Sequence, residues 1–484
     1  MISPMLKYKI KNNQHGTMLV MALVFTLLFA VVAMGLSSMV AAQHKLGLKK
    51  ISWAQALSAA EAGVNYYRWH LAHAPQDYQD GTGEAGPYIH EYKDASGNTV
   101  GYFSLNITPP SDCSNTLTIE STGWIINDPN VTRTIKVKYG MASFAQFAFL
   151  TNSNVWFGDT ENLYGPLHSN GGIRLDGYNI GKSTSAKETY ICGSEHGCLD
   201  EVKDGIWGSG GDQILWDFPV SNIDFDAVTA DLANLRTLAQ ASMCSATEDC
   251  YWPQQGLGWH LEFINDGTFN IYRVTKLENP VWSYDMFNWI RESNDIERET
   301  YIGNYNIPAT CGIIFVGDDL WIDGVVNGRV TVVAAKLPDS GSNPKIIING
   351  NLTYETKDDT NSLGLISQSD ILIPLNTAPD NLEINGALLA QKGHVMRRHY
   401  LDSGWRRVPA SLEGYVIRNS LSLYGAIMTN MVWTWSWVNT TGAVISGYEN
   451  TQMTYDPNLN YNPPPGFPTT GEYQFLQWEE TTEK

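Results

Sequence analysis

The chain begins with its clearest pattern, an unbroken apolar run. Residues 17–42 are 26 consecutive uncharged and mostly apolar residues, with lysines on both sides. About 20 such residues suffice to cross a bilayer as a helix, whereas a secretory signal has an apolar core of about 7–15 residues. Ala41 and Ala42 could imitate a signal cleavage site, but the run is long for a signal. It predicts a membrane-spanning helix.

The helical pattern continues beyond this run. Apolar side chains recur at roughly helical spacing, and no proline lies between Pro4 and Pro75. We therefore expect one helix to about residue 75, apolar on all sides in its first half and amphipathic in its second. His70 and His73 could meet on one face, but such a pair without further ligands indicates surface residues rather than a metal site. The residues with helical spacing are Ile51, Ala54, Leu57, Val64, Tyr67 and Leu71.

This segment resembles the N-terminus of PilX-like minor pilins, a type IV pilus family, and of the related large K-type pseudopilins of type II secretion. The matching features are a short basic leader ending in Gly16, the apolar stretch from Thr17, and ALSAAEAGVNYYRW at 56–69. The resemblance covers about the first 75 residues. It implies that a prepilin peptidase cuts after Gly16 and that Thr17 becomes the methylated N-terminus.

The resemblance also implies partners and a location. The partners are other pilin or pseudopilin subunits, the inner-membrane assembly platform and the inner membrane itself. The chain would cross the inner membrane once and then enter an extracellular filament or a periplasmic pseudopilus. In typical major pilins the fifth residue after the cut is a glutamate that is thought to pair with a neighbour's terminal amine, and here that residue is Met21. This difference favours a tip or rare subunit.

Glu61 lies where the predicted helix turns amphipathic, and two interpretations stay open for it. It could make a contact that orders subunits in a filament. It could equally be a solvated or locally paired carboxylate.

Beyond residue 75 the pattern changes to strands. Alternating segments rich in Thr, Ile and Val within 99–140 predict a small antiparallel sheet. From about residue 141, short apolar strands end in Asn-Gly or a lone Gly, and Gly328 and Gly350 are 22 residues apart, as are Gly364 and Gly386. This quasi-repeat predicts a parallel β-helix, with an irregular β-sandwich as the alternative.

The predicted fold class is therefore α+β and mainly β. We divide the chain into a basic leader (1–16), a long helix (17–75), a small antiparallel β head (76–140), a β-helix-like domain (141–450) and a Pro-rich tail (451–484). Residues 178–305 interrupt the strand pattern and are read as an insertion with one helix within 221–243. The tail is expected to be extended and to lie against the last strands of the repeat.

Charge and cysteines indicate an exported body. The first fifty residues carry +6 and the whole chain −19, so the remainder carries −25, which repels the phosphates of nucleic acids. Two cysteine pairs, Cys192 with Cys198 and Cys244 with Cys250, each enclose five residues and predict local disulfides. Cys113 and Cys311 remain and could pair across domains. A metal site that uses His196 is the alternative, but its spacing is not that of a zinc finger.

We expect no enzyme and no cofactor. The sequence has no nucleophile elbow, zinc-protease motif or phosphate loop. Asp318, Asp319, Asp323 and Asp370 are candidate carboxylates, although aspartates in turns usually bind the backbone. The chain is thus expected to assemble into a filament and to display its β domain for pilus assembly or adhesion. The alternatives are an uncut, anchored β-helix protein that binds surface glycan and, less favoured, a tethered polysaccharide lyase or hydrolase.

Several tryptophans could stack against sugars, although such residues more often fill a core. They are Trp156, Trp207, Trp252, Trp259, Trp433 and Trp435.

Overall fold

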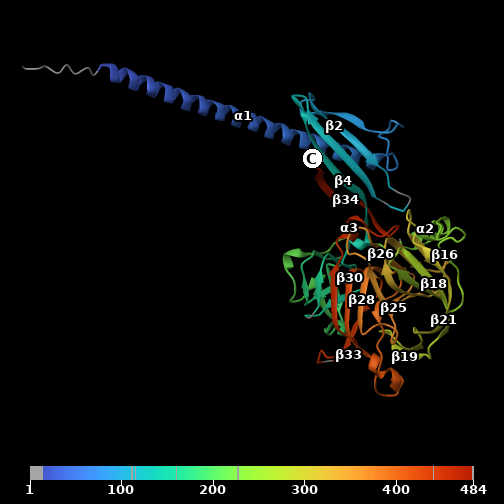
Figure 1. Ribbon diagram of the computed structural model, residues 1–484. Helices are drawn as coiled ribbons and strands as arrows, with labels where there is room; N and C mark the ends of the chain where they lie inside the picture. Colours follow the sequence, from blue (N-terminus) through green and yellow to red (C-terminus); the bar gives the residue numbers. More distant parts are fainter. Residues whose placement is uncertain are drawn as a thin grey trace, which may run out of the picture. The chain divides into compact units, whose positions relative to one another are not determined.

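The computed structural model describes residues 15–110, 113–114, 116–159, 161–225, 228–439 and 441–481. The chain is mainly β, with a long N-terminal helix and an antiparallel sheet, as predicted (Figure 1). It forms two compact units. The first contains residues up to 108, 118–137 and those from 478 on; the second contains 109–117 and 138–477. Residues 1–14 of the predicted leader lie outside the described residues.

The first unit contains α1 (His15–His73) and most of a five-stranded sheet. The strand order is β1 (Tyr88–Lys93), β2 (Thr99–Thr108), β3 (Thr116–Ile125), β4 (Asp128–Ser143) and β34 (Thr469–Thr481). Strands β4 and β34 continue into residues of the second unit. In β3, buried residues alternate strictly with half-buried ones, which is the pattern of a strand with one covered face.

Two strands of this sheet differ from the sequence expectation. Residues 88–93 lie outside the segments predicted as strands, yet they form β1 and pair antiparallel with β2. The last strand, β34, comes from the far end of the chain, because the tail runs past the second unit's strands and joins the sheet edge. The prolines of the tail lie on β24 (Arg329–Ala334), where Arg329 and Thr331 donate hydrogen bonds of 2.6 Å to the carbonyls of Pro463 and Pro465.

The second unit is built from ladders of short parallel strands. One ladder runs through β22 (Ile313–Val316), β24, β26 (Ser362–Ser367), β28 (Asn381–Ala390) and β30 (Ile417–Thr429). A second runs through β23 (Leu320–Val326), β25 (Ile346–Tyr354), β27 (Ile371–Ile373), β29 (Val395–Arg397) and β31 (Trp433–Thr434). The two ladders alternate along the chain, and their buried Ile, Leu and Val side chains form one core. Assignment to a β-helix stays a prediction.

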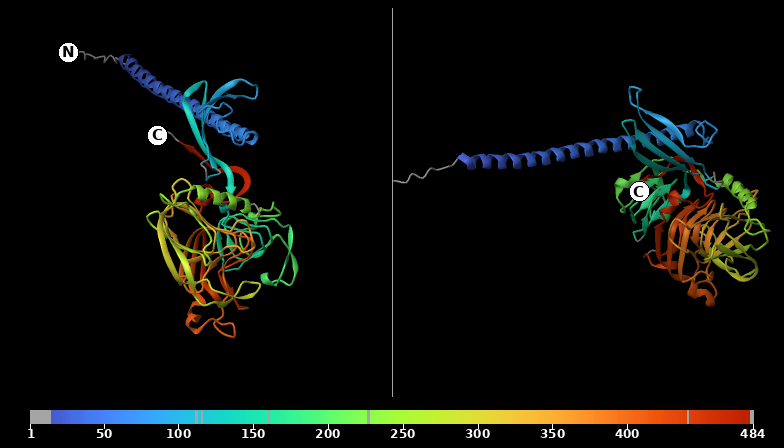
Figure 2. Two further views of the ribbon diagram at one scale, coloured as in Figure 1. Left: turned by 90° about the vertical axis from the view of Figure 1, so that its right-hand side faces the viewer. Right: turned by 45° about the horizontal axis from the view of Figure 1, so that its top comes forward.

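The ladder order departs from the chain order. The C-terminal strand β30 pairs in parallel with the early strand β5 (Phe149–Thr151), which pairs with β8 (Leu167–Ser169) and through it with β11 (Ser183–Ser185). Figure 2 accordingly shows green and red segments, far apart in the sequence, within one unit. The glycine spacing of 22 is not the register, because Gly364 pairs with Ala387.

A row of amide side chains follows the ends of the first ladder. Asn430 donates to the carbonyl of Gln391 at 2.8 Å, Asn152 to the side chain of Asn430 at 2.9 Å, and Asn170 to that of Asn152 at 2.8 Å. Each residue directly follows a strand of the ladder. The side chains of this row supply one another with hydrogen-bond partners at the turns, and of the three asparagines only Asn170 is buried. We call this row the amide ladder.

All six cysteines form disulfides, with Cα–Cα distances of 5.6 Å for Cys113–Cys311, 5.5 Å for Cys192–Cys198 and 5.2 Å for Cys244–Cys250. The first pair links two parts of the second unit and does not join the two units. The helix expected within 221–243 is α2 (Val228–Ala241).

Candidate functional site: the N-terminal helix

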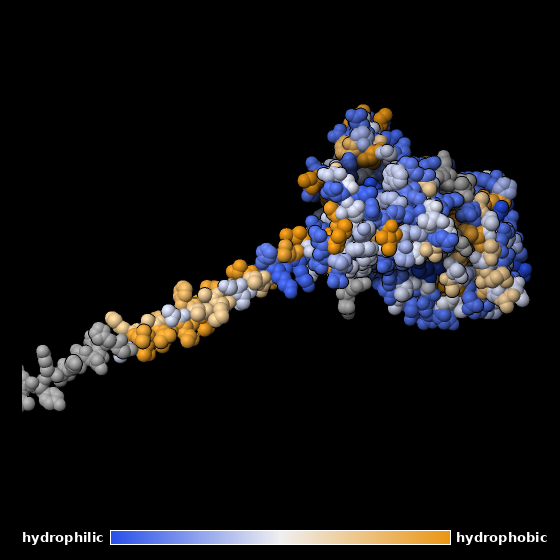
Figure 3. All heavy atoms as spheres, turned by 90° about the horizontal axis from the view of Figure 1, so that it is seen from above, coloured by the Kyte–Doolittle hydropathy of each residue, from blue (hydrophilic) through white to orange (hydrophobic). Residues whose placement is uncertain are grey.

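The first half of α1 is apolar and bare. Large hydrophobic side chains from Met18 to Ile51 are more than half exposed, and Met21 is 65% exposed. This half is long and apolar enough to cross a membrane. Figure 3 shows the apolar side chains along this part of the helix. Water would penalise so large an apolar surface, so this half of α1 requires a lipid or protein environment.

The second half of α1 packs on the sheet of the first unit through small residues. Ala56, Ala59 and Ala60 are fully buried, and a Cβ added at Gly123 of β3 would meet the backbone of these three residues. Likewise, a Cβ at Gly63 would meet the side chains of Ser121 and Phe103. The two glycines therefore allow helix and sheet to approach almost to backbone contact.

This packing corrects the helix face predicted from the sequence. Ile51 and Ala54 were expected to be covered but are exposed, and Leu57 is half-buried. Val64, Tyr67 and Leu71 are buried as expected. The pattern of large apolar residues was misleading because the contact uses Ala and Gly, whose small size permits close approach.

Glu61 lies on the exposed side of this half of α1. Its backbone carbonyl accepts a 3.0 Å hydrogen bond from the Asn65 amide. Gly16 and Thr17, the expected processing junction, lie in the first turns of α1, and Thr17 is exposed.

The segment that follows α1 is held by two histidine–aspartate pairs. His70 Nε2 lies 3.0 Å from Asp77 Oδ2, and His90 of β1 lies 2.6 Å from Asp80. Backbone N–H groups of Gln79 and Gly81, together with His70, lower the pKa of Asp77 despite partial desolvation. His73 instead contacts the carbonyl of Trp69 at 2.8 Å, so the two helix histidines do not form a shared site.

The candidate catalytic carboxylates of the second unit are engaged by the protein. Asp318 accepts backbone N–H groups of Gln255 and Gly256, at 2.7 and 3.0 Å. Asp319 accepts that of Lys345, and Asp370 contacts His394 and Arg398 at 3.2 and 3.0 Å. Among the described residues, no group of three or more His, Cys, Asp or Glu is placed to hold a metal ion.

Asp323 belongs to an ion-pair cluster in which two half-buried carboxylates flank the buried His260. His260 Nε2 lies 3.3 Å from Asp323, and its Nδ1 lies 2.9 Å from Glu299. Burial by itself lowers the pKa of His260, but the hydrogen bonds and negative charges of the two carboxylates outweigh it and raise the pKa to about 9. His260 is therefore a cation at neutral pH, paired on both sides.

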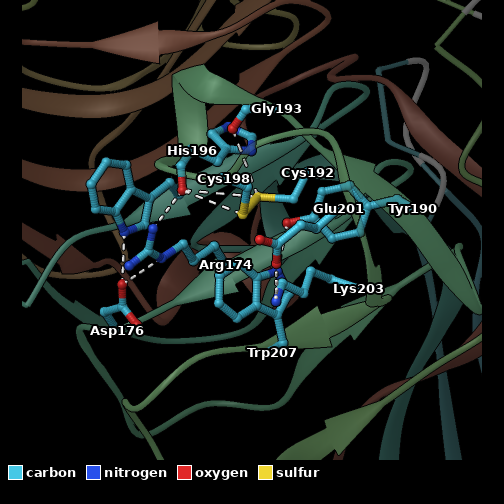
Figure 4. The surroundings of a disulfide bond; sticks show 11 residues. Arg174, Asp176, Tyr190, Cys192, Gly193, His196, Cys198, Glu201, Lys203 and Trp207 are labelled. Atoms are coloured by element: carbon cyan, nitrogen blue, oxygen red, sulfur yellow. Dashed lines mark hydrogen bonds and ion pairs between the residues drawn. A yellow bond between two sulfur atoms is a disulfide. The ribbon is translucent and has the colours of Figure 1, made fainter.

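The tryptophans considered for sugar stacking divide into two groups. Trp252, Trp259 and Trp435 are buried in the core, and Trp433 is half-buried against it. Trp156 and Trp207 flank Arg174, whose guanidinium carbon lies 4.4 and 5.0 Å from their ring centroids (Figure 4).

The guanidinium of Arg174 also donates hydrogen bonds to neighbouring residues. It donates to Asp176 at 2.7 Å and to the carbonyl of His196 at 2.5 Å, so it ties down the Cys192–Cys198 loop (Figure 4). These contacts connect β9 (Ile173–Leu175) to the loop closed by Cys192 and Cys198, and His196 lies inside that loop.

Comparisons with known proteins add little to these observations. No family model matches the chain, and no curated protein matches it. Among solved structures, the competence-associated pilin ComZ from Thermus thermophilus is similar with a TM-score of 0.31 and 12% sequence identity, over 89% of this chain and 98% of that chain. At this level neither function nor fold is transferable, so the functional argument rests on the residues of this chain.

Proposed function

We propose that this chain is a pilin-like subunit that assembles into a filament through α1 and displays its second unit. The observation that carries the proposal is the division of one continuous helix into a bare apolar half and a half docked on its own sheet. The bare half would first lie in the inner membrane and then pack against other subunits. Because the docked half packs on the antiparallel sheet, the position of the helix in the filament would set the position of that sheet.

Two finer features belong to the same proposal. The chain would be a PilX-like minor pilin or K-type pseudopilin, cut by a prepilin peptidase after Gly16 and methylated on Thr17. Met21 in place of a glutamate supports a location at or near the tip, since a methionine cannot pair with a neighbour's terminal amine. Display rather than catalysis is supported by the carboxylates described above, whose oxygens bind backbone N–H groups and cationic side chains.

The test is the N-terminal residue of the membrane-bound mature protein, measured by mass spectrometry with and without a prepilin peptidase. A methylated Thr17 that depends on the peptidase would support the proposal. Gly16→Val should block the cut, whereas Gly35→Val, in the exposed helix where no atom lies within 4 Å of an added Cβ, should not. An intact Met1, or a cut near Ala42, would contradict the proposal and favour an anchored or secreted protein.

The tip location has its own test. Quantitative mass spectrometry of isolated filaments sorted by length should find a constant, small number of copies per filament. A copy number that rises in proportion to filament length would contradict the tip location and indicate a shaft subunit.

A further inference from the structure

A loop of the second unit between Tyr400 and Val408 carries Trp405 and Arg406 at its tip. The base is formed by Tyr400 and Val408, both buried, and the Val408 N–H donates to the Leu401 carbonyl at 2.8 Å. His399, just before the loop, exchanges two backbone hydrogen bonds with Tyr284 of β19 (Val281–Tyr284), of 2.9 and 3.1 Å. The loop is thus fixed at both ends, and its tip carries Trp405 and Arg406.

Arg406 lies in a cage of indole rings. Its guanidinium carbon is 4.1 Å from the ring centroid of Trp405, 5.2 Å from that of Trp289 and 5.3 Å from that of Trp282. Cation–π attraction favours this position. No hydrogen bond or ion pair joins its side chain to any part of the chain that the structure describes, and its Nε is buried without a partner.

An arginine carries five N–H donors, and in half-buried Arg406 only Nε is buried without a partner, at a cost in free energy, whereas the terminal amino groups stay accessible to a ligand. The indole rings pack against the guanidinium but accept no strong hydrogen bond from its edge. The neighbouring Arg407 differs, because its Nη1 lies 3.6 Å from Glu413. Arg406 is therefore a positioned donor set that lacks an acceptor.

Trp405 offers a flat surface beside these donors. Its side chain is 76% exposed, although Arg406 stacks on the ring and Trp282 approaches it at 6.0 Å and 67°. An exposed indole held in one orientation can pack against a flat apolar face of a ligand with little loss of conformational freedom. A ligand that contacts both side chains needs a ring with an apolar face for the Trp405 indole. It also needs a planar anionic group at the edge of that ring for the Arg406 donors.

We propose that Trp405 and Arg406 bind an acidic saccharide. The C–H face of a pyranose ring would stack on the indole of Trp405, and the ring carboxylate would accept paired hydrogen bonds from Arg406. The chain carries a net charge of −19, so it repels anions at long range. An anion that also stacks on Trp405 gains a short-range contact that offsets this repulsion. The inference does not depend on cleavage after Gly16, so its failure would leave the proposed assembly role standing.

The test is isothermal titration calorimetry on the full chain in a neutral detergent, with trigalacturonic acid as the probe. Trp405→Ala and Arg406→Gln should each weaken binding by roughly ten- to a hundredfold. Arg406→Lys keeps the charge but loses the planar fork, and should also weaken binding. Trp69→Ala, at another exposed tryptophan on α1, should bind like the native chain. Far-ultraviolet circular dichroism would confirm that each variant is folded.

Two further probes separate the sources of the anion. The methyl ester of trigalacturonic acid, which keeps the rings and lacks the charge, should bind at least tenfold more weakly. Glycerol 3-phosphate, a lipid headgroup analogue without a sugar ring, should not compete. Absence of trigalacturonate binding, equal binding of the ester, equal competition by glycerol 3-phosphate, or unchanged binding in folded Arg406→Gln would each overturn the inference.

Discussion

Gly123→Ala should loosen the second half of α1 from its sheet. The new methyl group would lie against the carbonyl of Ala56 and the amide of Ala60, and 2.9 Å from the carbonyl carbon of Ala59. These are backbone atoms of a regular helix, so they cannot move singly, and the whole helix must shift outward. Elsewhere in a strand the same substitution would be neutral or favourable, because alanine has less conformational freedom to lose on folding.

The magnitude follows from the packing. Overfilling a close-packed core costs about 1–3 kcal/mol. An outward shift also exposes part of Val64, Tyr67 and Leu71, whose full burial is worth about 1.5–3 kcal/mol each for side chains of this size. We therefore expect the opening free energy of this contact to fall by about 2–4 kcal/mol, which corresponds to roughly a thirty- to thousandfold rise in the open population.

Hydrogen exchange on the detergent-solubilised full chain measures this opening. Amides of β3 and of residues 56–71 should exchange faster by the factor above, while amides of the second unit should not change. The matched control is Gly47→Ala, where no atom lies within 4 Å of an added Cβ and the helix should gain about 1 kcal/mol from the better helix former. Native protection in Gly123→Ala would refute the claim that the glycine is needed for backbone approach.

Three further outcomes are expected. The raised pKa of His260 adds stability that is complete below about pH 6.5 and is lost as pH rises through about 9, so the unfolding free energy should fall by about 3 kcal/mol over that range, and His260→Gln should remove this slope in pH-dependent denaturant unfolding. Replacing Cys113 and Cys311 by serine opens a loop with a sequence separation of 198 and should lower the stability of the second unit by about 5 kcal/mol in chemical unfolding, whereas unchanged stability would mean that the unfolded chain is already compact. Asn152→Ala breaks two bonds of the amide ladder and should cost about 1 kcal/mol by the same assay, because the Asn152 side chain is exposed and Asn170 still donates to the Ile223 carbonyl; no measurable loss would contradict a stabilising role for the ladder.

Some features of this protein are local, and the sequence alone predicted them. The length and apolar character of α1, the three strands within 99–140, α2 and the two short disulfide loops all depend on residues within a few turns or strands of one another. Helical and strand periodicities, and cysteines that enclose a few residues, are readable without knowledge of the fold. The presence of methionine rather than glutamate at position 21 is likewise read directly from the sequence.

Other contacts depend on the tertiary structure and could not be predicted from the sequence. The closest approach of α1 to its sheet is at Ala56, Ala59, Ala60 and Gly63, and periodicity in large apolar residues cannot reveal a contact that depends on small ones. The pairing of β30 with β5, and with it the amide ladder, joins residues 278 positions apart. The indole cage of Arg406 draws on a hairpin near residue 285 and a loop near residue 405. Such features arise only when the core brings distant strands together, because their free energy comes from contacts that no local segment contains.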